Sequence, residues 1–231
     1  FIKAGKGMSY MKQIAVLGLG RFGESVARSL EALGVEVMGV DISQEKVADI
    51  APFITHAVQG DLLDSDALES LGLRNFDVVI LSIKSVEISC LATIAIKDNG
   101  ARYIVAQASG DAHGKILERV GVDKVIMPEK DMGARIARNL AGNNIIDFME
   151  LSSKHSLMEM TTPDDWVGHT LKENNIRNKY GVNVVAIRSG KNIQVSPKSD
   201  VIIHDGDVLV VIGENNDLEK MGKHSSSSRK K

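Results

Sequence analysis

A short glycine-rich segment, residues 12–23, constrains the fold of this chain more than any other feature. Its apolar first half is typical of a buried strand, and an amphipathic helical pattern follows over 22–33. In such a strand–turn–helix unit, Gly18 permits a sharp turn, Gly20 lets the backbone approach a pyrophosphate, and Gly23 allows close packing of helix on strand. Free amide groups and the positive end of the helix dipole favour an anion here. The segment therefore predicts a nucleotide-binding site.

Asp41 is a second feature that supports this prediction. Residues 36–41 are typical of a further strand, and its terminal carboxylate lies about 20 residues beyond the glycine turn, as dinucleotide-binding sequences require. We expect Asp41 to accept hydrogen bonds from ribose hydroxyls and to repel a 2′-phosphate, which disfavours NADP. The alternative is that Asp41 only opens the following helix, with Ser43 as its N-cap.

Strand-like and helix-like segments alternate regularly between residues 12 and 127. This alternation predicts an α/β fold with a Rossmann-like parallel sheet covered on both faces. The expected strands are 12–17, 36–41, 56–59, 77–83, 102–107 and 124–127, and the expected helices are 22–33, 43–51, 64–71, 87–99 and 111–120. Ligands of such sheets bind at the carboxyl ends of the strands. Asp61, the 82–84 loop and Gln107 follow three of these strands, so we expect them near one crevice.

The pattern changes after Pro128, which is expected to open a helix that runs to about residue 140. The rest predicts a small α+β module, with short strands between turns that contain glycine, proline and aspartate. Its expected elements are strands 145–151, 157–160, 182–187, 193–195 and 208–212 and helices 167–174 and 215–221. We expect a nucleotide-binding domain over 12–142, a second domain over 150–221, and tails at 1–11 and 222–231.

Composition excludes several classes of function. The net charge is −2, so no basic excess points to nucleic acid or to an anionic membrane surface. No apolar stretch approaches the roughly 20 residues that cross a bilayer. The single cysteine, Cys90, rules out an intrachain disulfide and fits a reducing cytoplasm. Any role at a membrane is therefore expected to depend on a partner.

Four charged side chains are further candidates for the crevice. Arg21 follows Gly20 directly and suits a phosphate contact. Lys84 and His113 are close to the same crevice in sequence order. Glu129 opens a helix beyond the last strand, where a carboxylate together with phosphate oxygens suits Mg²⁺ or Ca²⁺. The simpler interpretation is a solvated surface residue for the first three and a capping acid for Glu129.

The sequence offers little catalytic chemistry. A nicotinamide dehydrogenase needs a proton donor or acceptor beside the hydride path, yet the six histidines are scattered without an orienting partner. No Cys/His cluster has metal-ligand spacing, and neither a GxSxG elbow nor a Walker A lysine is present. This pattern favours sensing of a ligand over its turnover.

Taken together, these residues resemble the regulatory subunits of Trk/Ktr-type potassium transporters, which are cytoplasmic RCK proteins. The similarity spans about residues 12–221. The motifs that carry it, in order, are IAVLGLGRFG (14–23), Asp41, LGLRNFD (71–77), KILERVG (115–121), PEKDMG (128–133) and IRNKYG (176–181). The resemblance implies an N-terminal Rossmann-like lobe that binds ATP, ADP or NAD(H), a crossover helix, and a C-terminal RCK lobe.

The resemblance also implies an assembly and a mechanism. Dimers would assemble into an octameric ring against the inner face of the membrane, held there by a membrane-embedded potassium transporter subunit, without direct membrane insertion. ATP carries an extra phosphate beside Arg21 and, across a subunit contact, beside Glu129 and a cation. ATP and ADP would therefore favour different ring geometries, which would open or close the partner.

Site residues follow from the same resemblance, with Arg21 and the glycine turn at the phosphates, Asp41 at the ribose and Asp61 near the adenosine. The full expected nucleotide set is Gly18, Gly20, Arg21, Phe22, Gly23, Asp41, Ile42, Lys46, Asp61, Leu62, Ser82, Ile83, Lys84, Gln107, His113 and Glu129. In several relatives the C-terminal lobe binds cyclic di-AMP at a dimer interface, and the matching positions here are Leu171, Arg177, Asn178, Asn183 and Pro197.

The chain departs from the family pattern at three places. The loop 82–87 lacks the usual glycine and asparagine, Gln107 stands where a basic residue is usual, and Asn178 replaces a small residue.

Two other functions compete with the regulatory one. A small NAD-dependent oxidoreductase would need a general acid, for which His113 is the candidate, and an RCK regulator could serve a different cation transporter or channel.

Overall fold

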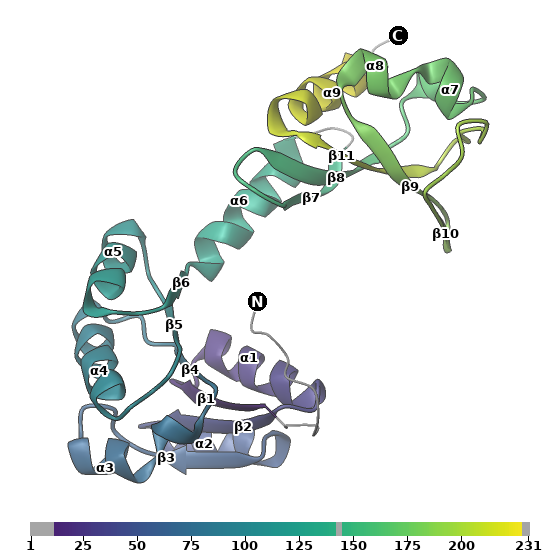
Figure 1. Cartoon of the computed structure of the whole chain (residues 1–231). Coiled ribbons are helices and arrows are strands. Elements are labelled where there is room, and N and C mark those ends of the chain that lie inside the picture. Colours follow the sequence, from purple (N-terminus) through teal and green to yellow (C-terminus); the bar gives the residue numbers. More distant parts are fainter. Residues whose placement is uncertain (1–11, 142–144, 228–231) are drawn as a thin grey trace, which may run out of the picture. The chain divides into compact units, whose positions relative to one another are not determined.

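The computed structural model describes residues 12–141 and 145–227 (Figure 1). The chain divides into two compact units between Pro128 and Glu129, and each is described by itself. This boundary groups the helix after Pro128 with the second unit, and the expected domain limits, 12–142 and 150–221, stay a prediction. Within the described ranges, no helix combines the length and the apolar character that a transmembrane span requires.

The first unit is built on a six-stranded sheet in which all neighbours are parallel, in the order β3-β2-β1-β4-β5-β6. Its strands are β1 (Gln13–Leu17), β2 (Glu36–Asp41), β3 (His56–Gln59), β4 (Val78–Leu81), β5 (Ile104–Gln107) and β6 (Lys124–Ile126). Its helices are α1 (Arg21–Ala32), α2 (Gln44–Ile50), α3 (Ser65–Ser70), α4 (Val86–Asp98) and α5 (Asp111–Val120), with short 3₁₀ turns η1 (Ala51–Phe53) and η2 (Leu73–Asn75). The expected elements of this unit are confirmed, and their limits shift by no more than two residues.

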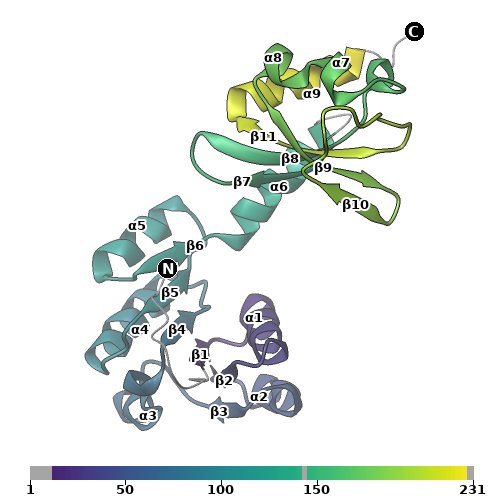
Figure 2. The same ribbon diagram turned by 45° about the vertical axis from the view of Figure 1, so that its right-hand side comes forward.

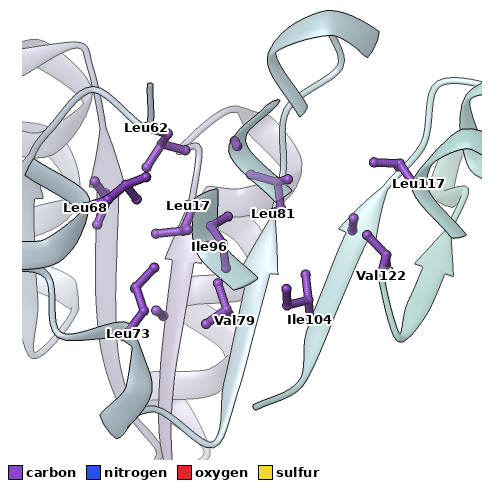
Figure 3. Close-up of a cluster of buried hydrophobic side chains, with 14 of the residues drawn as sticks. Leu17, Leu62, Leu68, Leu73, Val79, Leu81, Ile96, Ile104, Leu117 and Val122 are labelled. Atoms are coloured by element: carbon purple, nitrogen blue, oxygen red, sulfur yellow. The ribbon is translucent and has the colours of Figure 1, made fainter. Parts of the chain in front are cut away.

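The two faces of this sheet are covered by different helices, because alternate strand residues point to opposite faces. Ile14 and Val16 of β1 pack in a cluster with side chains of α1 and α2. Ala15 and Leu17 pack in a second cluster with side chains of α3, α4 and α5, which Figure 3 shows around Leu17. Full burial of each large apolar side chain contributes about 1.5–3 kcal/mol, so both layers stabilise the sheet. The layers are also visible in Figure 2.

β1 is the strand where the direction of winding changes. It pairs with β2 on one side and with β4 on the other. The chain leaves β1 through α1 toward β2, and it returns beside β1 only as β4. The loops after β1 and β4 therefore diverge at the carboxyl end of the sheet, and such a point is where open α/β sheets bind ligands.

The second unit contains a five-stranded antiparallel sheet in the order β10-β9-β11-β8-β7. Its strands are β7 (Ile145–Glu150), β8 (His155–Thr161), β9 (Asn183–Ser189), β10 (Asn192–Val195) and β11 (Val208–Glu214). Its helices are α6 (Pro128–Ala141), α7 (Leu171–Asn174), α8 (Ile176–Tyr180) and α9 (Asn215–Ser227), with the 3₁₀ turn η3 (Asp164–Trp166). Met158, Trp166, Leu209 and Leu218 belong to its buried core. The predicted fold class is thereby confirmed: a Rossmann-like α/β sheet and a small α+β unit.

Two expectations for the second unit were wrong. The helix expected over 167–174 forms only from Leu171, as the four-residue α7, because Gly168 (φ +82°) and the bridge between Thr170 and Ile202 hold the preceding residues in other conformations. The sequence did not predict α8, which is separated from α7 by the left-handed Asn175 (φ 49°). The helix expected to end at residue 221 continues as α9 to Ser227. Glycine disfavours a helix, yet Gly222 is buried, and an added Cβ there would lie 3.2 Å from Ile145. Packing on β7 thus accounts for the glycine inside this helix.

Candidate functional site

The glycine turn after β1 is held by close backbone contacts. Gly18 has φ +96°, a left-handed conformation that favours glycine, and its N–H donates to the Val40 carbonyl at 2.7 Å. A Cβ on Gly18 would lie 2.5 Å from the Ser82 carbonyl oxygen. A Cβ on Gly23 would overlap the Gly18 carbonyl oxygen. The predicted structural roles of Gly18 and Gly23 are therefore confirmed.

Gly20 differs from the other two glycines because the space beside it is open. A Cβ there would meet no atom within 4 Å, so the protein itself does not require glycine at this position. Gly20 is the N-cap of α1, and no side chain caps this helix end. Unsatisfied amide groups at a helix N-terminus attract anions. Arg21 is exposed at the first helical position, and Phe22 beside it is half-buried.

Asp41, at the end of β2, is a buried carboxylate that joins two loops. Its Oδ2 accepts a hydrogen bond from the Leu19 N–H at 2.8 Å and an ion-paired one from Lys46 Nζ at 3.1 Å. Its Oδ1 accepts from the Ser43 N–H at 2.9 Å. Burial alone would raise the pKa of Asp41, but the hydrogen bonds from Ser43, Leu19 and Lys46 outweigh it and lower the pKa. Asp41 is therefore anionic at neutral pH, and it fixes the glycine turn against the start of α2.

A cavity of about 380 Å³ opens at this end of the sheet. It is lined by Gly18, Gly20, Asp41, Ile42, Lys46, Gly60, Asp61, Leu62, Leu63, Ser82, Ile83 and Ile88. Its volume falls in the range of small-molecule sites, about 300–1,000 Å³. Ile42, Leu63 and Ile88 are large apolar side chains that stay exposed around it. The cavity thus combines a polar turn and a carboxylate with apolar walls, as an adenine nucleotide requires.

Sequence reasoning missed three lining residues: Gly60, Leu63 and Ile88. Leu63 adjoins the expected Leu62 in the loop after β3, where Asp61 Oδ1 accepts a hydrogen bond from the Leu63 N–H at 2.9 Å. Ile88 lies in the first turn of α4, and its apolar character matches an ordinary core position. Only the packing of α4 places it at the cavity, so the sequence held no separate signal for it.

Six expected residues of the first unit do not line the cavity: Arg21, Phe22, Gly23, Lys84, Gln107 and His113. Lys84 is exposed. Gln107 is buried behind Ser82, whose Oγ donates to Gln107 Oε1 at 2.9 Å. His113 is buried at the start of α5, and burial lowers its pKa.

Glu129 lies in the first turn of α6 in the second unit, where it is exposed. Its expected contact with phosphate and a cation stays a prediction. Within the part of the chain that the structure describes, no group of three or more His, Cys, Asp or Glu side chains gathers to hold a metal ion. A cation here would need phosphate oxygens among its ligands.

The second unit has its own cavity, of about 400 Å³. Its lining comes from α7, α8, β9 and the loop after β10: Leu171, Lys172, Asn175, Ile176, Arg177, Val182, Asn183, Val184, Pro197 and Ser199. Four residues of the expected cyclic-dinucleotide set thus surround one hollow. The fifth, Asn178, does not line it, and its Nδ2 donates to Asn175 Oδ1 at 2.7 Å.

Comparisons with known proteins agree with this two-part organisation. The chain matches the TrkA-N domain family over residues 14–128 and the TrkA-C domain family over residues 157–225. It is 45% identical over 213 residues to Ktr system potassium uptake protein C of Bacillus subtilis (strain 168), which covers 92% of this chain and 96% of that protein. It is 38% identical over 210 residues to Ktr system potassium uptake protein A of the same organism, covering 90% and 95%.

Solved structures show the same fold. The GsuK channel bound to NAD matches with a TM-score of 0.67 over 98% of this chain and 41% of that chain. Sequence identity in this match is 14%, so it establishes a likeness of fold.

Proposed function

Because this chain belongs to the family of Ktr potassium uptake proteins with TrkA-N and TrkA-C domains, we propose that it is a nucleotide-sensing regulatory subunit of a potassium transporter. The observation that carries this proposal is the cavity at the glycine turn, with an uncapped helix N-terminus and an anionic carboxylate. The transporter itself would be a separate membrane subunit, and this chain would act at the cytoplasmic face of the membrane.

Each part of an adenine nucleotide would find matching groups in this cavity. Its phosphates would approach Gly20, where the backbone is open, and accept hydrogen bonds from the first amides of α1. A carboxylate offers about four lone-pair sites, and three donors already use those of Asp41. A ribose hydroxyl fits the capacity that remains. The base would lie against Ile42 and Leu63, which are otherwise exposed apolar side chains.

Regulation would come from the difference between nucleotides. A ligand shifts a conformational equilibrium only by its difference in affinity for the two states. The extra phosphate of ATP would lie beside Arg21. Glu129 of a neighbouring subunit, together with Mg²⁺ or Ca²⁺, would approach the same phosphate. ADP lacks this group, so the two nucleotides would favour different geometries of a homo-oligomeric ring, for which the family suggests eight subunits. NAD(H) is a third candidate for the same cavity.

The second cavity is the candidate site for cyclic di-AMP. Arg177 is an exposed cation at its wall that suits a phosphodiester, and Asn183 adds a side-chain amide. Leu171 and Pro197 supply apolar surface for a base. The ligand would then adjust the same ring through the second unit.

The competing function as an oxidoreductase would require His113 as general acid. Its side chain is 3% exposed and lies outside the lining of the cavity. Both ring nitrogens already face serine partners. These contacts favour the regulatory function.

The proposed change of ring geometry between nucleotides, called the switch below, is tested by calorimetry and small-angle scattering on the purified chain with ATP, ADP or NADH. We expect ATP and ADP to bind saturably and to give assemblies of different dimensions. Identical affinities together with unchanged dimensions would reject the switch. Co-expression with potassium-transporting and other cation-transporting membrane subunits then identifies the partner, because only the true partner should co-purify.

A further inference from the structure

A buried hydrogen-bond network lies behind the nucleotide cavity and links α4 to α5. Its centre is His113 in the first turn of α5, which is 3% exposed. His113 Nε2 lies 2.7 Å from the Oγ of Ser89, a fully buried residue of α4. His113 Nδ1 accepts a hydrogen bond from the Ser109 N–H at 3.1 Å, and Ser109 Oγ lies at the same distance.

The direction of every hydrogen bond in this network follows from the backbone donor. Because the Ser109 amide can only donate, His113 Nδ1 carries no proton and Nε2 carries the ring hydrogen. Nε2 therefore donates to Ser89 Oγ. The Ser89 hydroxyl in turn donates to the Val86 carbonyl at 3.1 Å. The chain of bonds runs in one direction, from the loop after β5 through His113 to the first turn of α4.

This turn of α4 is part of the cavity wall. Ser89 directly follows Ile88, which lines the cavity. The same turn begins at Ser85, whose Oγ accepts from the Ile88 N–H at 3.3 Å. Ser82 lies just upstream in the lining and is bonded to Gln107 at the end of β5. The segment 82–89 is thus tied to the β5–α5 region at both ends.

We infer that His113 is a positioning residue, which holds the first turn of α4, and with it Ile88, against the bound nucleotide. The inference rests on the proposed function, since it assigns a task within the same site. His113 does not touch the ligand in this account, and its effect passes through Ser89. Removing the Nε2–H to Oγ bond would let the wall move and would weaken nucleotide binding.

The opposite end of the same helix pair provides a matched control. Lys97 Nζ, in the last turn of α4, donates to the Gly121 carbonyl that ends α5 at 3.1 Å. This contact also joins α4 to α5, but no residue near it lines the cavity. Lys97→Met therefore removes a link between the two helices without touching the wall.

The experiment measures the ADP dissociation constant by calorimetry for the full chain and five variants. Ser89→Ala and His113→Asn both remove the Nε2–H to Oγ bond, and each should raise the constant about tenfold. The double variant should raise it by the same factor, because the two changes remove one contact. His113→Gln can place an amide nitrogen where Nε2 lies, so it should stay within about twofold of wild type, as should Lys97→Met.

The outcomes separate this inference from the proposed function. If wild type binds ADP and Ser89→Ala and His113→Asn bind it equally well, the positioning role is overturned while the proposed function stands. If His113→Gln loses as much affinity as His113→Asn, a general packing role replaces the positioning one. Failure of wild type to bind any adenine nucleotide overturns both.

Discussion

The carboxylate of Asp41 connects three donors while it lines the nucleotide cavity. From the sequence, its place at the end of a strand, its suitability for ribose and the alternative of opening the following helix were evident. Its second task, to hold the Leu19 amide of the glycine turn, depends on how close the turn comes to β2 in three dimensions. The side chain of Asp41 thus stabilises the glycine turn and also lines the cavity in which the nucleotide would bind.

Asp41→Asn should destabilise the chain by about 1–3 kcal/mol, because an amide presents its NH₂ group to donors that need an acceptor. Loss of the ion pair with Lys46 adds to this effect. Urea denaturation followed by circular dichroism measures the change. Asp61→Asn is the control, because Asp61 is exposed and its carboxylate accepts a hydrogen bond from the Leu63 N–H. Equal stability of the two variants would contradict the structural role of Asp41.

His113 gives the stability a predictable pH dependence. Burial lowers its pKa, so the unfolded chain, with a histidine pKa of about 6.5, takes up the proton first as the pH falls. The contribution of neutral His113 to the free energy of unfolding is complete above about pH 6.5. It is lost as the pH falls through the folded-state pKa. Wild type should therefore lose more stability between pH 7.5 and pH 5.5 than His113→Gln. Parallel losses in urea midpoints would refute this assignment.

At the scale of elements, the strand–turn–helix unit 13–32 was the part that the sequence predicted best. Positions 18 and 23 require glycine because a Cβ at either one would clash with a backbone carbonyl oxygen. By contrast, the break between α7 and α8 arises from the left-handed Asn175, and the helical Gly222 depends on Ile145. Asn tolerates the left-handed region locally, whereas the place of Gly222 depends on tertiary packing, which local propensity does not contain.

Substitutions at the glycines separate folding from binding. Gly23→Ala places a Cβ on the Gly18 carbonyl and should destabilise by about 3 kcal/mol or more, measured as a loss of urea midpoint. Gly20→Ala meets no protein atom, so it should cost about 1 kcal/mol at most, as a change of N-cap. It should nevertheless weaken ADP binding about tenfold or more, since its methyl group occupies the approach of the phosphates. Normal ADP affinity of Gly20→Ala would show that the phosphates lie elsewhere.

At the scale of the whole molecule, the cavity at the glycine turn lies in the first compact unit, and the cavity beside α7 and α8 lies in the second. Nine of the twelve residues around the first cavity were expected from the sequence, but only four of the ten around the second. The sequence did not predict Ile88 or the bonds of His113, because both depend on how α4 packs against α5. The chain contains a single tryptophan, Trp166, and it is buried in the core of the second unit.

Trp166 allows the two sites to be followed separately. A ligand that binds only the folded state at 100 times its dissociation constant stabilises by about 2.7 kcal/mol. Cyclic di-AMP should therefore raise the thermal midpoint seen by Trp166 fluorescence. ADP should mainly raise the thermal midpoint of the unfolding of the first unit, which is followed by circular dichroism. Arg177→Ala should abolish the first shift and leave the second. A shift of Trp166 fluorescence with ADP alone would contradict this division of ligands.

We propose that the first unit binds an adenine nucleotide and leaves it chemically unchanged. Equilibrium dialysis against radiolabelled ATP, with chromatography of the bound fraction, tests it most directly. We expect saturable binding, a marked loss of binding in Gly20→Ala, and recovery of the bound label as ATP. Binding that does not saturate, or recovery of the label as a reaction product, would contradict it.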